Sequence, residues 1–231
     1  PGTGKTEIAE IIGEIFCKLN VLKKQQFKKV VRSDLIAGYL GQTALKTKDT
    51  IKDCLGGVMF IDEAYALGNN EKRDSYAKEC VDTLCEAMSA HKNELMVIIA
   101  GYENEIKECF FSQNQGLESR FSWSFTTDKY TPEELCKIFN KKVIDSGWKI
   151  DKDALDVQWF DKHKKSFTAY GRDMELLFSK VKIAHGRRIF CNKDKVDKTE
   201  INIDDLENGF KKFTSQKQKE VKDDNLSTMY T

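Results

Sequence analysis

The sequence has no apolar run long enough to cross a bilayer and no secretory leader pattern. Its longest apolar stretch, LMVIIAG at residues 95–101, is far shorter than the about 20 residues that a membrane-spanning helix requires. The first residues do not show the basic segment followed by an apolar segment that is typical of a signal peptide. We therefore expect an intracellular, cytoplasmic protein without a membrane partner.

Metal-ligand spacing is also lacking. The seven cysteines form no C-x-x-C pair, and the three histidines lie at no ligand spacing to them or to one another. This pattern argues against the common zinc motifs. We expect reduced cysteines that are mostly buried in the core.

An excess of charge of either sign is absent, since 38 basic residues oppose 37 acidic ones and the formal net charge is +1. Proteins that bind nucleic acid or anionic membranes through a basic surface usually carry a large excess of lysine and arginine. We therefore disfavour nucleic acid as a partner. Arginine is scarce, with six among the 38 basic residues, and each arginine thereby gains weight in a search for functional residues.

The chain opens on a glycine-rich segment, PGTGKT at residues 1–6. It matches the last six positions of the phosphate-binding loop G-x-x-x-x-G-K-[ST], whose first glycine would precede Pro1. Isoleucines then recur at helical spacing, so a helix begins at about Lys5 and its N-terminus faces the loop. Backbone N–H groups and the helix dipole favour phosphate there, the Lys5 ammonium adds charge, and the Thr6 hydroxyl can bind Mg²⁺. The predicted ligands are the phosphates of a nucleotide and Mg²⁺, and the predicted loop residues are Pro1, Gly2, Thr3, Gly4, Lys5 and Thr6.

A second motif, GGVMFIDEAYAL, follows at residues 56–67. Its apolar run is typical of a buried parallel strand, and Asp62 and Glu63 stand at the carboxyl end, the edge where ligands of open α/β sheets bind. We predict that Asp62 binds Mg²⁺ and that Glu63 polarises the attacking water. The alternative is that both are only a solvated strand exit. The stretch between the motifs can hold an extra strand and two helices, which suits nucleoside triphosphatases that insert a strand there.

Strands and helices alternate up to residue 127. We expect strands at 27–32, 58–61, 95–101 and 121–127, with helices at 41–54, 73–91 and 105–111 between them. Alternation of this kind predicts an α/β fold in which a parallel sheet carries helices on both faces.

From residue 130 the pattern becomes helical. The segment TPEEL supplies a threonine cap, a proline at the first helical position and glutamates in the first turn, and further helices are expected at 154–164, 172–190 and 203–213. We therefore expect a nucleotide-binding α/β domain at 1–129, a small helical lid domain at 130–214 and a polar, disordered tail at 215–231.

Two arginines are candidates for nucleotide contacts. Arg120 directly precedes the last expected strand of the sheet, where a ring-shaped assembly would place it against the neighbouring subunit's nucleotide as an arginine finger. The alternative is a surface salt bridge. Arg172 stands at the N-terminus of a lid helix, where its charge opposes the helix dipole unless an anion is near. We predict that it reaches the γ-phosphate, with incidental capping as the alternative.

The segment AGYLGQT carries an aromatic residue between two glycines after the second expected strand. We predict that Tyr39, Leu40 and Gly41 form a loop that faces a central channel and grips a polypeptide. Simple packing of the tyrosine is the alternative.

Four segments together, DLIAGYLGQTALKTKDTIKDCLGGVMFIDEAYAL, VIIAGYENEI, NQGLESRF and YTPEEL, closely resemble the CbxX/CfqX family of AAA+ ATPases, which includes red-type rubisco activase and the sporulation protein K group. The resemblance extends from Pro1 to about Ile189. It implies hexameric rings in which ATP hydrolysis drives a pore loop along a substrate protein. It assigns phosphate and Mg²⁺ binding to Lys5 and Thr6. The further roles that it implies are a Walker B pair at Asp62 and Glu63, a pore aromatic at Tyr39, a finger at Arg120 and a second sensor at Arg172.

The sequence departs from that pattern at two places. The polar first sensor that usually ends the fourth strand is replaced by AGYENE, and Tyr102, Glu103 and Asn104 are all candidates for its role. The strand that normally precedes the phosphate loop is missing, and we expect it upstream of Pro1 in a longer natural chain. A central strand cannot be removed without leaving its neighbours' backbone groups unpaired.

Three functions are consistent with these residues. The first is an ATP-hydrolysing protein remodeller, which Glu63 and Arg120 favour. The second is a nucleotide-gated scaffold with negligible turnover. The third is a nucleic-acid motor, which the near-neutral charge disfavours.

Overall fold

The computed structural model describes residues 2–39, 41–68, 74–151, 156–191 and 198–227. Two predicted site residues, Pro1 and Leu40, lie outside this range. The chain divides into two compact units, which are described separately. One comprises Gly4–Thr126, and the other comprises Thr127–Thr231 together with Pro1–Thr3.

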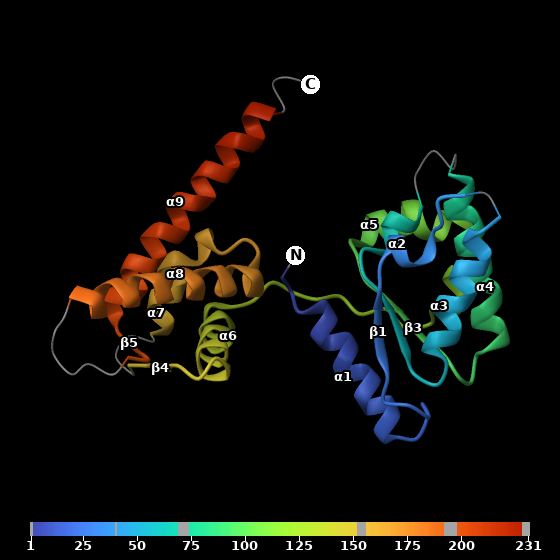
Figure 1. Cartoon of the computed structure of the whole chain (residues 1–231), viewed down its shortest axis with the longest axis horizontal. Helices are drawn as coiled ribbons and strands as arrows, with labels where there is room; N and C mark the ends of the chain where they lie inside the picture. The colour runs from blue at the N-terminus through green and yellow to red at the C-terminus, as the bar shows by residue number, and fades with distance from the viewer. Residues whose placement is uncertain (1, 40, 69–73, 152–155, 192–197, 228–231) are drawn as a thin grey trace. The chain divides into compact units, whose positions relative to one another are not determined.

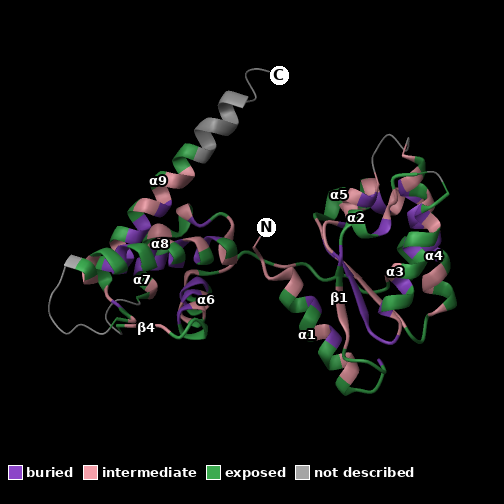
Figure 2. Cartoon of the chain, in the orientation of Figure 1, coloured by how far each residue is buried: buried purple, intermediate pink, exposed green. Residues whose placement is uncertain are grey.

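The first unit is built on a three-stranded parallel sheet, with strands β1 (Phe27–Val30), β2 (Val58–Ile61) and β3 (Met96–Ile99) in that order. The central strand β2 is buried along its whole length (Figure 2). Its side chains alternate between the two faces of the sheet. Met59 and Ile61 join the core beneath helices α3 (Thr43–Cys54) and α4 (Ser75–Ala90), whereas Phe60 joins Ala9 of helix α1 (Lys5–Lys18) on the other face. The apolar run of the second motif is therefore a doubly covered strand, as the sequence predicts.

Helices lie on both faces of this sheet (Figure 1). Their bounds are α1 (Lys5–Lys18), α2 (Arg32–Leu35), α3 (Thr43–Cys54) and α4 (Ser75–Ala90). Short turns complete the unit: η1 (Ala64–Leu67), α5 (Glu103–Glu105), the π-helical turn η2 (Ile106–Phe110), η3 (Phe111–Gln113) and η4 (Glu118–Arg120).

The strand expected at residues 121–127 is not formed, so this prediction is wrong. Phe121 packs on Phe110 and Phe111, but Trp123 and Phe125 are 68% and 71% exposed. Within the described part of the chain, no strand pairs with this segment. A strand is stable only when its backbone groups are paired with a neighbour, and apolar alternation alone does not supply one.

The second unit is helical, as expected. Its elements are α6 (Pro132–Asp145), β4 (Lys149–Ile150), α7 (Val157–His163), η5 (Lys164–Ser166), α8 (Tyr170–Cys191), β5 (Glu200–Ile201) and α9 (Ile203–Ser227). The predicted cap of α6 is present: Thr131 Oγ1 accepts from the Glu134 amide at 3.3 Å, and the Glu134 carboxylate accepts from the Thr131 amide at 2.8 Å. The core is rich in aromatic side chains, among them Phe139 and Phe160.

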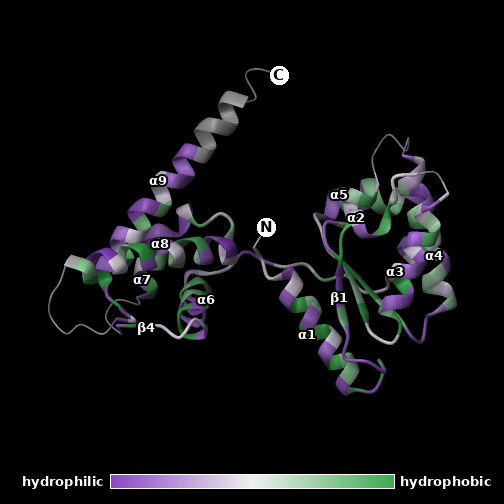
Figure 3. Cartoon of the chain, in the orientation of Figure 1, coloured by the Kyte–Doolittle hydropathy of each residue, from purple (hydrophilic) through white to green (hydrophobic). Residues whose placement is uncertain are grey.

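Helix α9 continues to Ser227, whereas the polar sequence predicts a disordered tail from residue 215. Hydrophilic residues predominate along the coloured part of α9 in Figure 3, and that polarity is the reason for the expectation. Lysine, glutamine and glutamate are nevertheless good helix formers, and neither proline nor glycine follows Gly209. The first turns of α9 are also anchored by the buried Phe210 and Phe213, so the helix propagates from a packed start.

Candidate active site

The phosphate loop has left-handed glycines at its two key positions. Gly2 and Gly4 have φ of 73° and 74°, a conformation that costs other residues more. Gly4 caps α1 with its backbone alone, without a side-chain hydrogen bond, so the first N–H groups of α1 are not capped by a side chain. Lys5 and Thr6 form the first turn of this helix and are half-buried. Such a helix start is suited to a phosphate.

Asp62 and Glu63 lie at the carboxyl end of β2, at the edge expected for ligands. Asp62 Oδ2 accepts a hydrogen bond from the Lys29 ammonium at 2.6 Å, and Asp62 Oδ1 accepts from the Glu63 amide at 3.1 Å. Glu63 has φ of 53°, a left-handed conformation that is strained in a residue with a side chain. The Ala64 amide then donates to the carbonyl of Ala100 at 2.9 Å, which fixes the sharp turn after Glu63.

Two tyrosines connect Glu63 to Lys5. The Tyr65 hydroxyl donates to the Glu63 carboxylate, and the Tyr65 and Tyr102 rings have centroids 6.1 Å apart. The Lys5 ammonium lies 5.2 Å from the centroid of the Tyr102 ring, within the range of a cation–π contact. The structure thus brings residues of the two sequence motifs into one cluster. Sequence reasoning missed Tyr65, although its place two residues after Glu63 on a tight turn was a usable signal.

The three first-sensor candidates differ in their surroundings. Tyr102 contacts both Lys5 and Tyr65. Glu103 is exposed and pairs with Lys107 at 2.7 Å, and the hydrogen bond from that ammonium holds the pKa of the Glu103 carboxyl below its usual value. The geometry favours Tyr102, because within the described residues it is the candidate that contacts Lys5 and Tyr65.

Arg120 is exposed in η4 and is held by neutral acceptors of its own unit. Its Nε donates to Ser89 Oγ at 3.0 Å, and its Nη1 donates to the carbonyl of Gly116. No carboxylate pairs with Arg120 among the residues that the structure describes, so the salt bridge considered as an alternative is not seen. The Arg120 guanidinium is therefore exposed and without a neutralising carboxylate among the described residues.

Arg172 lies in the first turn of α8 and is exposed. Its neighbour Gly171 donates its amide to the carbonyl of Gly2 at 3.0 Å, and Gly2 lies so close to the carbonyl of Ala169 that a Cβ atom there would collide with it. The Tyr130 hydroxyl donates to the carbonyl of Thr3 at 3.1 Å. The residue just before Arg172 therefore contacts Gly2, a phosphate-loop residue that belongs to the same unit as α8.

Tyr39 is 73% exposed, which argues against simple packing, and Gly41 has φ of 79°.

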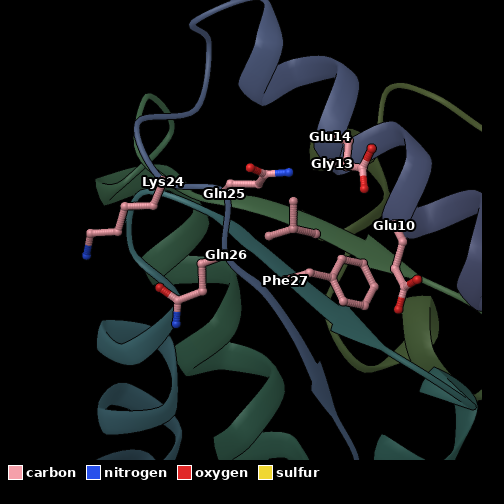
Figure 4. Close-up of a pocket in the computed structure, with 8 residues that line it drawn as sticks. Glu10, Gly13, Glu14, Lys24, Gln25, Gln26 and Phe27 are labelled. Atoms are coloured by element: carbon pink, nitrogen blue, oxygen red, sulfur yellow. The ribbon is translucent and has the colours of Figure 1, made fainter.

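A cleft of 220 Å³ lies elsewhere, between α1 and the sheet (Figure 4). It forms where Gly13 lets α1 approach Val58 of β2, and it is flanked by Glu10, Glu14 and Phe27. None of the predicted site residues that the structure describes lines this cleft. No helix among the described residues combines the length and apolar character needed to cross a membrane.

The architecture and these residues define a P-loop ATPase domain of the AAA class. The sequence profile of the ATPase family associated with various cellular activities (AAA) matches residues 1–120, and the chain belongs to this family. Its relatives place it more narrowly among the CbxX/CfqX-type members.

Two relatives and one solved structure illustrate this placement. A cfxQ-like protein of Acanthamoeba polyphaga mimivirus, R730, is 37% identical over 232 residues, which span 100% of this chain and 57% of the viral protein. The CfxQ homolog of Cyanidium caldarium is 32% identical over 213 residues, or 89% of this chain and 74% of that protein. The crystal structure of the FIGL-1 AAA domain superposes with a TM-score of 0.61 at 17% identity, over 95% of this chain and 74% of that chain, and this likeness concerns the fold alone. The chain thus spans little more than half of the viral relative's length.

Proposed function

We propose that this protein is an ATP-hydrolysing motor that remodels a protein substrate by pulling it through the pore of a hexameric ring. The observation that supports this best is the cluster of Lys5, Tyr102, Tyr65 and Glu63. It joins a phosphate-binding lysine to a candidate general base at the carboxyl edge of a parallel sheet.

Each member of the cluster has a distinct task. The N–H groups of the loop and the Lys5 ammonium bind the phosphates, while Glu63 orients and polarises the attacking water. The Tyr65 hydroxyl holds one oxygen of the Glu63 carboxylate, which leaves the other oxygen able to accept from water. Tyr102 takes the place of the polar first sensor because it contacts both the lysine and Tyr65.

The residues present fit a magnesium ion. Asp62 already accepts a cation, the Lys29 ammonium, so its carboxylate is placed as a cation ligand. Within the described residues no cluster of three or more acidic, histidine or cysteine side chains could hold a metal by itself, and so sparse a set suits Mg²⁺, which keeps water and phosphate ligands. Thr6 and Asp62 would hold the ion, which supplies charge neutralisation of the phosphates when bound.

Lys29 competes with such an ion for Asp62. We expect Lys29→Met to lower the Mg²⁺ concentration that gives half-maximal ATP binding by about two- to fivefold, a modest effect because the pair is partly solvated. A Mg²⁺ titration with a fluorescent ATP analogue measures this. The matched control is Lys28→Met, which removes the neighbouring ammonium paired with Asp53 at 2.9 Å. An unchanged or raised Mg²⁺ requirement in Lys29→Met would contradict the competition.

Arg120 is proposed to act on the nucleotide of a neighbouring subunit. We expect Arg120→Ala rings and Glu63→Gln rings each to be nearly inactive, and mixtures of the two to regain part of the ATPase activity. In a mixed ring, some sites combine an intact Glu63 with an intact Arg120 from the next subunit. Steady-state phosphate release against mixing ratio measures the gain. If mixing restores nothing although both variants assemble, the finger does not act between subunits.

The pore role of Tyr39, Leu40 and Gly41 is tested by trapping. A Glu63→Gln variant loaded with ATP is expected to retain its substrate protein, and the same variant carrying Tyr39→Ala is expected to release it. Identification of the retained proteins by mass spectrometry names the substrate. Equal retention by both variants would remove Tyr39 from substrate binding.

A further inference from the structure

A nearly buried ion pair joins α9 to the start of α8. Its lysine lies in the part of α9 where the sequence predicts a disordered tail. The Lys217 ammonium lies 2.7 Å from Asp173 Oδ2, and the two side chains are 24% and 4% exposed. The same ammonium donates to the carbonyl of Ser166 at 3.0 Å and to Thr168 Oγ1 at 3.1 Å. The ammonium therefore uses all three of its N–H donors, although Lys217 lies on a largely polar helix.

Asp173 in turn fixes the backbone just before it. Its carboxylate accepts from the Ala169 amide at 2.7 Å, and between these two residues Tyr170 has φ of 44°. A left-handed conformation is disfavoured for a residue with a side chain and persists only where its surroundings hold it in place. The carboxylate held by Lys217 is therefore one of the groups that maintain the strained start of α8.

The strained start of α8 carries Arg172 and contacts Gly2, a phosphate-loop residue of the same unit. The amide of Gly171 donates to the carbonyl of Gly2 at 3.0 Å. The Tyr170 ring packs edge-on against Tyr130, whose hydroxyl donates to the carbonyl of Thr3. A shift of this turn would move Arg172 and the loop contact together.

We propose that Lys217 is a positioning residue for Arg172: through Asp173 it holds the first turn of α8 in the conformation that lets Arg172 reach the terminal phosphate of ATP. The turn of α9 that carries Lys217 is then part of the nucleotide-sensing apparatus. The inference rests on the proposed function in that ATP is taken as the ligand and Arg172 as its sensor.

The test compares Lys217→Met with Lys219→Met in the purified full-length protein. Lys219 lies on the same helix, is exposed and has no partner among the described residues. Its substitution therefore removes the same charge and leaves the contact between Lys217 and Asp173 intact. We expect Lys217→Met to weaken ATP binding relative to ADP binding by about fivefold or more, and Lys219→Met to leave the ratio unchanged. Titrations with a non-hydrolysable ATP analogue and with ADP give the two affinities.

A double-mutant cycle separates positioning from general destabilisation. If Lys217 acts through Arg172, Lys217→Met has no further effect on the ATP-to-ADP ratio in an Arg172→Ala background. Should Lys217→Met fail to fold, hydrogen exchange of the Ala169 and Gly171 amides in the wild-type protein tests the same point. Exchange is expected to slow more with the ATP analogue than with ADP, and equal protection would overturn the inference.

The outcomes also distinguish this inference from the proposed function. If Arg172→Ala changes the ATP-to-ADP ratio and a folded Lys217→Met does not, only the role of Lys217 is refuted. If the wild-type protein does not bind ATP, or Arg172→Ala leaves the ratio unchanged, the sensing role of Arg172 fails and the inference fails with it.

Discussion

Substitution of Glu63 by glutamine is expected to lower ATP turnover by at least about 10²-fold while ATP affinity changes little, because an amide cannot act as the general base. Glu63 is positioned by a strained backbone and by the Tyr65 hydroxyl, and glutamine keeps nearly the same shape. Steady-state phosphate release and equilibrium binding of ATP measure the two effects.

The matched control for this experiment is Glu86→Gln on the exposed face of α4, which is expected to retain full turnover. The experiment also separates two of the functions considered. A wild-type protein that binds ATP but shows no turnover above that of Glu63→Gln would be a nucleotide-gated scaffold and not a motor.

Replacement of Asp205 by asparagine is expected to reduce the free energy of unfolding of the helical unit by about 3–5 kcal/mol, because it removes the charged partner of a buried network. The Asp205 carboxylate is 2% exposed and accepts from Arg188 Nε at 2.9 Å and from Arg188 Nη2 at 2.8 Å. His185 Nδ1 lies 3.0 Å from the same carboxylate, and the Asn202 amide donates to it at 3.2 Å. Urea unfolding followed by circular dichroism measures the loss, with the exposed neighbour Asp204→Asn as control.

The same network makes an acid-dependent contribution to stability. Burial raises the pKa of the Asp205 carboxyl, but hydrogen bonds from Arg188, His185 and the Asn202 amide outweigh it, and the net pKa is lowered. A carboxyl with a lowered pKa in the folded state stabilises the fold above its unfolded pKa and loses that contribution as the pH falls through the folded value. Below about pH 4 the wild-type protein should therefore lose stability more steeply than Asp205→Asn. Parallel pH profiles of the two proteins would contradict the assignment.

Local patterns in the sequence predict much of this fold. The apolar run of β2 flanked by glycines predicts a covered strand, and the carboxyl ends of parallel strands share an edge, so the position of Asp62 and Glu63 follows from pattern alone. The cap of α6 is likewise predicted by four consecutive residues, Thr131, Pro132, Glu133 and Glu134.

Features that depend on a distant partner could not be read in this way. Residues 121–127 alternate like a strand, but strand formation requires a neighbour that no local pattern specifies. The contact of Lys29 with Asp62 joins two strands, and that of Lys217 with Asp173 joins two helices. Each pair combines common charged residues far apart in the chain, so only the three-dimensional arrangement distinguishes them from ordinary surface charges.

The alternation of side chains along β2 has a consequence for evolution at this site. Met59 and Ile61 fill one layer and Phe60 the other, so inserting or deleting one residue in this strand would exchange the two layers and turn Asp62 towards the opposite face. Core packing on both faces of β2 thereby fixes the positions of Asp62 and Glu63 at the edge of the sheet. Insertions or deletions in this strand are therefore expected to prevent folding of the unit, and any loss of activity would follow from that.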